Sequence, residues 1–340
     1  MNYQTSLSQK LMQERWQITT AMDLFKWNRS IVLLFLCSCC SYKEEHAINR
    51  EYPIANEQAA IELGKKLFFD PMLSANQEVS CATCHQPSKS FTDGLKTTTL
   101  GVTGKSLGIN TPTLLNLDQS QFFFFDGGSS DLASTVFNPL THPDEMANDM
   151  SSLLEYLTSD SSYHSKFESA FNTDTLVTSM LLKSIARYIE TLQSSNSRFD
   201  AYLNGDIALL QGEQMGWFYF QKRSCNRCHI PPLFFDNKFH RESSLTFSIK
   251  GEFKLGDKAL GRFNISQDTM DIGKFKTPTL RNLIFTSPYM HDGRYPSLSM
   301  VLDNHPVQLN EAEKQKKMTD FEKSVIIKFL YSLTDSTVLE

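Results

Sequence analysis

Two five-residue stretches decide the fold of this chain: Cys81-Ala82-Thr83-Cys84-His85 and Cys225-Asn226-Arg227-Cys228-His229. Both have the spacing Cys-x-x-Cys-His, which is typical of haem c attachment. In such a site each cysteine sulfur bonds a haem vinyl group, and the histidine binds the iron as proximal ligand. The sequence therefore predicts two covalently bound haems.

Other uses of paired cysteines fit the sequence less well. Zinc sites usually place two Cys-x-x-Cys units about 12–20 residues apart, whereas 140 residues separate Cys84 from Cys225. A thioredoxin-like motif needs only one pair, in a βαβ context. Of the seven cysteines, the other three lie near the N-terminus, so no pair remains for a structural disulfide.

The N-terminal region has the pattern of a secretion signal. Lys26 and Arg29 precede the apolar run 31–36, which is too short to cross a bilayer as a helix. The alternative is a short buried helix. The stretch before Lys26 is long and polar for a signal, so translation starting at Met22 is an option.

The apolar run ends in Leu36-Cys37-Ser38-Cys39, which resembles a bacterial lipobox. Cys39 is the expected site of lipidation, with Cys37 and Cys40 as alternatives. Residues 1–40 would then be a lipoprotein signal region and residues 41–56 a polar tether. We therefore expect an extracytoplasmic chain on the periplasmic side of a bacterial membrane, held by a lipid anchor alone.

The composition agrees with a globular protein. The chain has 340 residues, of which 40% are hydrophobic and 21% charged. Its formal net charge of −5 gives no basic surface for nucleic acid.

An internal duplication accompanies the two cysteine motifs. Thr111-Pro112-Thr113-Leu114-Leu115-Asn116 recurs as Thr277-Pro278-Thr279-Leu280-Arg281-Asn282, and each copy is followed in register by Asp-Gly, at Asp126 and Asp292. Repeats in register indicate duplicated structural units. We expect two domains, 57–205 and 206–340.

The hydrophobic spacing is helical in the segments between the motifs. Loops rich in Gly, Pro and polar residues follow each cysteine motif. The expected fold class is all-α, with helices at 57–69, 150–156, 175–193, 212–221 and 319–333.

Several further segments resemble the bacterial diheme cytochrome c peroxidase family. They are Leu63–Asp70, Phe91-Thr92-Asp93-Gly94, Asn138-Pro139, Glu145-Met146, Gly261-Arg262-Phe263, Phe275–Asn282 and Pro288–Arg294. The resemblance implies two cytochrome c-like domains, each enclosing one haem. One haem would react with peroxide and the other would transfer electrons.

The resemblance also assigns metal ligands. In the family the sixth ligand of the second haem lies shortly after the His-Asp-Gly-Arg segment, and the matching position in this chain is His305. A neutral imidazole is a good iron ligand, so His229 and His305 would bind the second iron, unless His305 is a surface residue. The same position in the first repeat is Pro139, which cannot ligate, so His85 would face an open site. One calcium ion would be bound by Asn110 and by backbone carbonyls around Thr277 and Pro278.

Two departures from the family concern the first haem. The loop 86–110 contains no histidine to block the resting enzyme, which resembles the subgroup that includes the oxidase that matures tryptophan tryptophylquinone on a partner protein. The place expected for the family's glutamate, which moves the peroxide proton, falls on Ala133 or Ser134. Asp131 is the candidate substitute, with His142 and Glu145 as alternatives. The family's inter-haem tryptophan is also not seen.

Four consecutive phenylalanines, 122–125, suggest either core packing or a hydrophobic distal pocket. Packing is the expectation.

Three functions follow from the resemblance. The first is reduction of hydrogen peroxide to water with electrons from a small cytochrome c or cupredoxin. The second is oxidation of an aromatic residue of a partner protein. The third is electron transfer without catalysis. A homodimer is left open.

Overall fold

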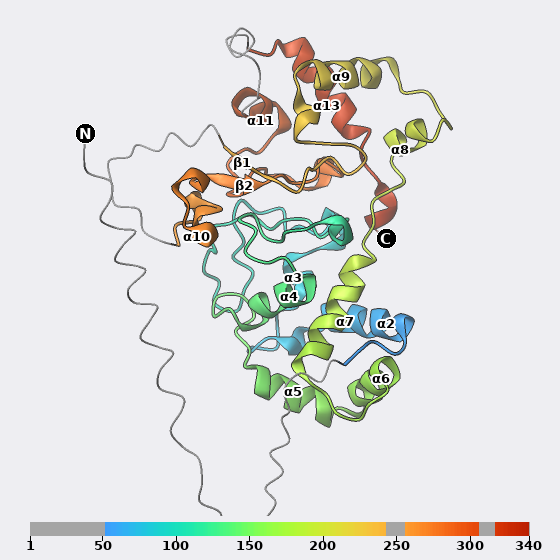
Figure 1. Cartoon of the computed structure of the whole chain (residues 1–340), viewed down its shortest axis with the longest axis vertical. Helices are drawn as coiled ribbons and strands as arrows, with labels where there is room; N and C mark the ends of the chain where they lie inside the picture. Colours follow the sequence, from blue (N-terminus) through green and yellow to red (C-terminus); the bar gives the residue numbers. More distant parts are fainter. Residues whose placement is uncertain (1–51, 243–255, 306–316, 340) are drawn as a thin grey trace, which may run out of the picture. The chain divides into compact units, whose positions relative to one another are not determined.

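The computed structural model describes residues 52–242, 256–305 and 317–339 (Figure 1). The expected signal region 1–40, with Met22 and Cys39, lies outside these residues, as does most of the expected tether. Within the described ranges no helix is both long and apolar enough to cross a bilayer. The all-α prediction is confirmed: the described elements are mainly helices, and the two strands are three residues each.

Helices account for most of the regular structure along the chain. In sequence order they are α2 (Glu57–Phe68), α3 (Cys81–Cys84), α4 (Leu132–Thr141), α5 (Met150–Ser159), α6 (Ser161–Phe171), α7 (Thr178–Glu190), α8 (Arg198–Leu203), α9 (Gln211–Lys222), α10 (Phe263–Ser266), α11 (Leu298–Asn304) and α13 (Asp320–Tyr331). Strands β1 (Phe239–Arg241) and β2 (Lys274–Lys276) pair antiparallel, with His240 opposite Phe275. Short 3-10 turns, among them Pro87–Lys89 and Cys225–Arg227, connect the helices.

Buried side chains form two hydrophobic clusters, one for each copy of the repeat. The first runs from Ala60 to Ile189 and the second from Phe199 to Leu333. Phe199 belongs to α8, so this helix packs with the second cluster although the expected boundary follows residue 205. The division into domains at that boundary stays a prediction.

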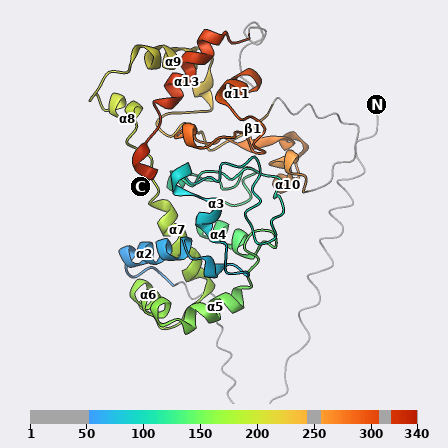
Figure 2. The ribbon, with the colours of Figure 1, turned by 180° about the vertical axis from the view of Figure 1, so that it is seen from behind.

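Each cluster is built on two helices that cross at a glycine. In the first copy α2 packs on α7, and a Cβ on Gly64 would overlap the carbonyl of Ser184. In the second copy α9 packs on α13, and a Cβ on Gly216 would overlap the carbonyl of Val325. Figures 1 and 2 show both pairs from opposite sides. The duplication in sequence is therefore a duplication of helix packing.

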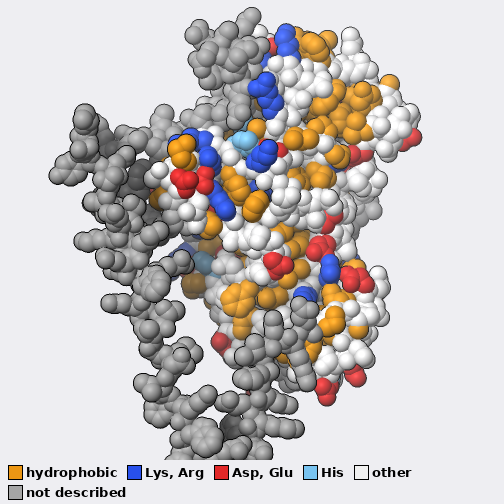
Figure 3. Space-filling model, viewed as in Figure 1, with side chains coloured by type: hydrophobic (Ala, Val, Ile, Leu, Met, Phe, Trp, Pro, Cys, Tyr) orange, Lys and Arg blue, Asp and Glu red, His pale blue; other side chains and the backbone are white. Residues whose placement is uncertain are grey.

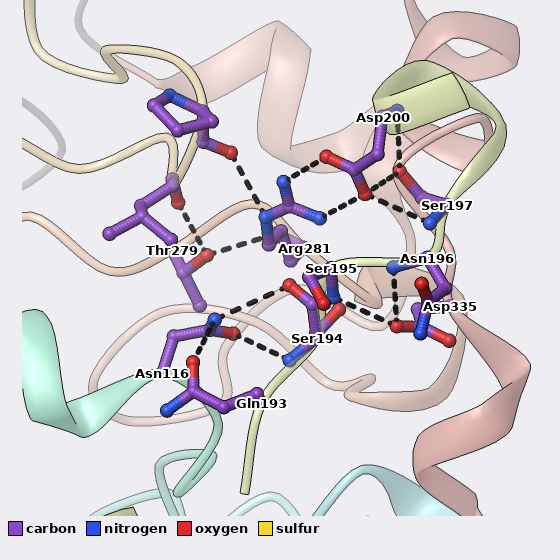
Figure 4. Close-up of polar contacts among 12 residues, drawn as sticks. Asn116, Gln193, Ser194, Ser195, Asn196, Ser197, Asp200, Thr279, Arg281 and Asp335 are labelled. Atoms are coloured by element: carbon purple, nitrogen blue, oxygen red, sulfur yellow. Dashed lines mark hydrogen bonds and ion pairs between the residues drawn. The ribbon is translucent and has the colours of Figure 1, made fainter. Parts of the chain in front are cut away.

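The repeated asparagines hold the chain after each of these helix pairs, and Figure 4 shows the first of them, Asn116. Asn116 accepts the backbone N–H of Ser194 (3.2 Å) and donates to its carbonyl (3.3 Å). Asn282 does the same with Asp335, at 2.7 and 3.3 Å. Both asparagines have a left-handed backbone (φ of 58° and 60°), a conformation that asparagine tolerates better than most residues.

The two copies also contact each other through a reciprocal pair of backbone hydrogen bonds. Asn110 donates its N–H to the carbonyl of His291, and Lys276 donates to Phe125, both at 2.8 Å. Asn110 and Lys276 occupy the same position in the repeat, as do Phe125 and His291. The two copies therefore meet with approximate two-fold symmetry at the segments that follow their cysteine motifs.

The predicted helices are confirmed with small shifts of their ends. Helix α4 is not among those that the sequence predicts: Pro139 lies inside it, and the helix forms around the buried residues Leu132, Val136 and Leu140. The phenylalanine run packs rather than lining one pocket: Phe123 is buried, and Phe122 contacts Phe239 of the second copy with 5.2 Å between ring centroids.

Candidate haem and peroxide sites

The first cysteine motif is held by a single helical turn. Helix α3 begins after Ser80, whose backbone N–H is accepted by the Thr83 hydroxyl (3.0 Å). Residues three apart lie on the same helix face, so Cys81 and Cys84 share one side. The chain then turns at His85, whose N–H donates to the Cys81 carbonyl at 2.8 Å. The second motif repeats this turn, with His229 donating to Cys225 at 3.0 Å.

Both motif histidines are fixed in the tautomer that a metal requires. Nδ1 of His85 lies 2.9 Å from the Phe91 carbonyl, and Nδ1 of His229 lies 2.9 Å from the Phe234 carbonyl. Because a carbonyl only accepts, each Nδ1 carries the proton and each Nε2 keeps its lone pair. Burial lowers the pKa of both rings, that of His229 to about 4, so both are neutral at pH 7. These are the properties of proximal iron ligands.

The four cysteines are thiols with raised pKa values. Burial raises the pKa of Cys81 and of Cys225 to about 12 and that of Cys84 to about 11. A thiolate zinc site or a redox-active dithiol needs a lowered thiol pKa. The Cys-x-x-Cys-His donor set of both motifs fits a covalently attached haem.

A second imidazole faces the second motif. His305 ends helix α11, and its ring centroid lies 6.1 Å from that of His229, with 51° between the planes. Two imidazoles on opposite sides of one metal, with bonds of about 2 Å and centroids about 1 Å behind each nitrogen, lie about 6 Å apart. The spacing fits one iron between the rings. In the first copy, the corresponding Pro139 lies inside α4.

The candidate acids Asp131 and Glu145 have different surroundings in the structure. Asp131 is exposed and caps α4, its carboxylate accepting the N–H of Ser134 at 2.6 Å. These surroundings do not favour a proton-transfer role. Glu145, in the turn after α4, is half-buried, and burial raises its pKa. Its charge is the last and smallest of the causes that shift the pKa of Cys81 and of Cys84, so Glu145 lies within electrostatic range of the first motif.

Asp131 as the acid stays a prediction, and the structure favours Glu145, one of the alternatives, by its burial. The prediction of Asp131 comes from counting residues along the chain from the Asp-Gly pair, which takes no account of burial. The available signal was Glu145-Met146, which resembles a family segment. Met146 is buried in the first cluster, and the N–H of Val102 donates to the Glu145 carbonyl at 2.8 Å. These contacts fix Glu145 in place.

The expected calcium ligands come from both copies of the repeat. Asn110 is buried, and its amide donates to the Leu95 carbonyl at 2.8 Å. Thr277 is buried as well, and its hydroxyl donates to Asp236 at 2.7 Å. Among the described residues, the sole group of three or more metal-ligating side chains is Cys228, Asp236 and His240. A calcium ion at Asn110 would therefore depend on backbone carbonyls, including that of Pro278, and on water.

The Cys228, Asp236 and His240 group belongs to the second haem motif. Nδ1 of His240 lies 3.8 Å from the Cys228 sulfur, and its Nε2 lies 2.7 Å from Asp236. Haem attachment would use the Cys228 sulfur, so we do not treat this group as a separate metal site.

Comparison with known proteins agrees with this geometry. Residues 58–208 match the family described as Di-haem cytochrome c peroxidase. A cytochrome c551 peroxidase of Nitrosomonas europaea is 33% identical over 275 residues, which cover 80% of this chain and 79% of that protein. The methylamine utilization protein MauG of Methylorubrum extorquens is 34% identical, with coverages of 83% and 79%.

A solved structure supports the same relationship. The crystal structure of a MauG-like protein associated with microbial copper homeostasis superposes with a TM-score of 0.76 at 26% identity, and the match covers 85% of this chain and 92% of that one. Sequence, fold and the arrangement of both cysteine motifs thus point the same way, and the chain belongs to the di-haem cytochrome c peroxidase and MauG family.

Proposed function

We propose that the chain binds two haems c and reduces hydrogen peroxide to water at the first of them. Cys81, Cys84 and His85 would hold one haem, and Cys225, Cys228 and His229 the other. A haem bound at His85 would supply an iron atom able to bind peroxide and to give it electrons. The observation that carries this proposal is the asymmetry of the two sites: His229 faces His305 across 6.1 Å, whereas Pro139 takes the matching position in the first copy.

Glu145 is the group that we propose for proton transfer at the first site. Cleavage of the O–O bond needs a base for one oxygen and an acid for the other. A carboxyl can fill both roles in turn, and a raised pKa makes it a better proton donor. Burial raises the pKa of the half-buried Glu145, which lies within electrostatic range of the first motif. Asp131 remains the alternative.

Electrons would enter through the second copy from a small redox protein. Ile230 directly follows His229 and is 46% exposed, so the backbone at the second motif reaches the surface. Exposed hydrophobic side chains also gather over α9 (Figure 3), where Phe218 is 53% exposed. Apolar surface of this kind is common where proteins dock. These features support a partner on this side of the chain.

Oxidation of an aromatic residue on a partner protein is the second candidate. The identities to a MauG protein and to a peroxidase, 34% and 33%, are too similar to separate them. Both candidates need the same open site at His85. They differ in whether the electrons come from a redox carrier or from a protein substrate.

The test uses the protein matured with covalent haem, shown by a mass of two haems per chain. Stopped-flow mixing with peroxide should oxidise the haem pair without prior reduction. Glu145→Gln should slow this oxidation by about 10²–10⁴-fold, because the amide cannot carry the proton. Asp131→Asn is the matched control and should react at the wild-type rate. If Asp131→Asn is the slow variant, Asp131 is the acid; if the wild type does not react with peroxide, the electron-carrier function replaces the enzyme.

A further inference from the structure

We propose that His142 takes protons from solvent and delivers them to Glu145, so that a histidine–glutamate pair supplies the first site. The inference rests on the proposed function, since it assumes that Glu145 is the acid. His142 is the residue that follows α4, and its Nδ1 lies 3.8 Å from Oε1 of Glu145. Its side chain is 36% exposed, whereas that of Glu145 is 28% exposed. Both side chains thus reach solvent in part, and the imidazole is the more exposed of the two.

The turn 142–147 holds the two side chains together. The carbonyl of His142 accepts the N–H groups of Glu145 and of Ala147, both at 3.0 Å. Met146 donates its N–H to the carbonyl of Pro139 at 3.2 Å, and its side chain is buried. Backbone contacts thus hold the two residues in one turn, and the His142 side chain adds a hydrogen bond from the N–H of Asp144 at 3.2 Å.

Protonation of His142 changes the partner of its Nδ1. In the neutral ring Nδ1 accepts the N–H of Asp144 at 3.2 Å. A proton on Nδ1 removes the lone pair and ends this hydrogen bond. The new N–H then has Oε1 of Glu145 as its acceptor, at a distance that a small rotation or one bridging water can close. The imidazole therefore turns from a backbone acceptor into a donor to the carboxyl.

Among the charged groups that face Glu145, His142 is the one suited to proton delivery near neutral pH. Lys258, from the second copy, and His142 both lower the pKa of Glu145, against the larger effect of burial. Asp144 turns away, toward the Thr103 hydroxyl (2.9 Å) and Lys105 (3.4 Å). Lysine holds its proton far above neutral pH, whereas histidine titrates near it. Cys81 and Cys84 would carry no exchangeable proton once bonded to haem.

The proton balance separates the roles of the two residues. One peroxide, two electrons and two protons give two waters. In O–O cleavage Glu145 moves the peroxide's own proton from one oxygen to the other, so no solvent proton is consumed. The two protons are taken up when a one-electron donor later reduces the oxidised pair. His142 should therefore matter in the second phase and not in the first.

The experiment compares His142→Gln, Glu145→Gln and Lys258→Gln in the haem-loaded protein. Oxidation by peroxide should stay within about 2-fold of wild type in His142→Gln. After oxidation, the return of His142→Gln to the resting state under a one-electron reductant should slow about 10-fold. This is less than the 10²–10⁴-fold typical of a general acid, because Glu145 is itself 28% exposed and can take protons from solvent directly. The wild-type return should also slow as the pH rises, and this dependence should vanish in His142→Gln. Lys258→Gln removes a charge facing Glu145 but no imidazole, and should return at the wild-type rate.

A second measurement does not depend on activity. The infrared band of the protonated Glu145 carboxyl, identified by its loss in Glu145→Gln, should titrate at a higher pH in His142→Gln, because the cation that favours the carboxylate is gone. The relay would be overturned if the midpoint of the Glu145 carboxyl titration is unshifted in His142→Gln. It would also be overturned if His142→Gln returns to the resting state as fast as Lys258→Gln. If Glu145→Gln itself is oxidised at the wild-type rate, the proposed acid fails and the relay fails with it. Slow oxidation of Glu145→Gln together with a normal return of His142→Gln refutes the relay alone.

Discussion

The carboxylate of Asp335 joins the two copies of the repeat, and replacing it with asparagine should destabilise the fold strongly. Asp335 is fully buried, just beyond α13 (Figure 4). One oxygen accepts the N–H groups of Ser195 (2.9 Å) and Asn196 (2.8 Å), which lie in the segment after α7. The other accepts the N–H (3.0 Å) and the hydroxyl (2.6 Å) of Thr337. One side chain therefore fixes two distant segments of the chain.

The expected loss in the free energy of unfolding follows from the hydrogen bonds of these four donors. An asparagine has one acceptor oxygen and one amide donor. With the amide turned toward Thr337, the Thr337 hydroxyl can rotate to accept from it, and the Thr337 N–H is left facing a donor. A hydrogen bond to a charged group contributes about 1.5–3 kcal/mol and a neutral one about 0.5–1.5 kcal/mol, so the lost bond and the weakening of the other three sum to about 3–5 kcal/mol. This is a large part of the 5–15 kcal/mol that is typical of a folded domain. The isosteric change leaves no cavity, so the cost reports the hydrogen bonds.

The assay is denaturant unfolding of the haem-loaded protein, followed by circular dichroism and by the fluorescence of Trp217, which packs against Phe329 of α13 with 5.1 Å between ring centroids. Asp206→Asn is the matched control, since Asp206 is exposed, and it should change the free energy of unfolding by less than about 0.5 kcal/mol.

The pH dependence gives a second check. Burial raises the pKa of Asp335, but hydrogen bonds from Thr337, Asn196 and Ser195 outweigh it and hold the pKa below its ordinary value. A lowered carboxyl pKa gives stability that is present above the unfolded-state pKa of about 3.9 and is lost as the pH falls through the folded-state value. The difference between wild type and Asp335→Asn should therefore be largest near pH 7 and shrink in acid. A cost below about 1 kcal/mol at pH 7, or one that does not change with pH, would refute this account.

Two further predictions concern the metals. The ferric protein should give one high-spin and one low-spin electron paramagnetic resonance signal, and His305→Ala should convert the low-spin signal alone; a low-spin signal that survives would exclude His305 as an iron ligand. Removal of calcium with a chelator should slow electron transfer between the haems, and Asn110→Ala should weaken calcium binding. Unchanged transfer after verified calcium removal would count against an ion at this place.

The sequence was sufficient for the parts of this protein that local spacing controls. The cysteine motifs fix which atoms lie next to one another along one turn, so Cys81, Cys84 and His85 could be assigned before any fold was known. The repeat Thr-Pro-Thr-Leu-x-Asn could be recognised because its residues make the same contacts in both copies. Each asparagine holds the segment that follows a long helix. The helix between Glu57 and Phe68 followed from its apolar face.

The choice between the candidate acids depends on tertiary structure. Asp131 and Glu145 stand at opposite ends of α4, and counting along the chain does not tell which of them is buried. Burial favours Glu145. The pair that Glu145 forms with His142 likewise depends on a turn whose backbone hydrogen bonds the sequence did not reveal.

The relation between the two copies was also beyond the sequence. The duplication showed that two similar units exist, because the same local structure requires the same residues in both copies. It did not show that Asn110 would donate to His291 and Lys276 to Phe125, or that Asp335 would accept Ser195 and Asn196. The first two bonds join backbone groups, and the Asp335 carboxylate accepts from backbone N–H groups, so no side-chain pattern marks the partners. The sequence by itself determined the chemistry of each cysteine motif, and only the folded chain decided which groups surround it, because that depends on contacts between residues far apart in the sequence.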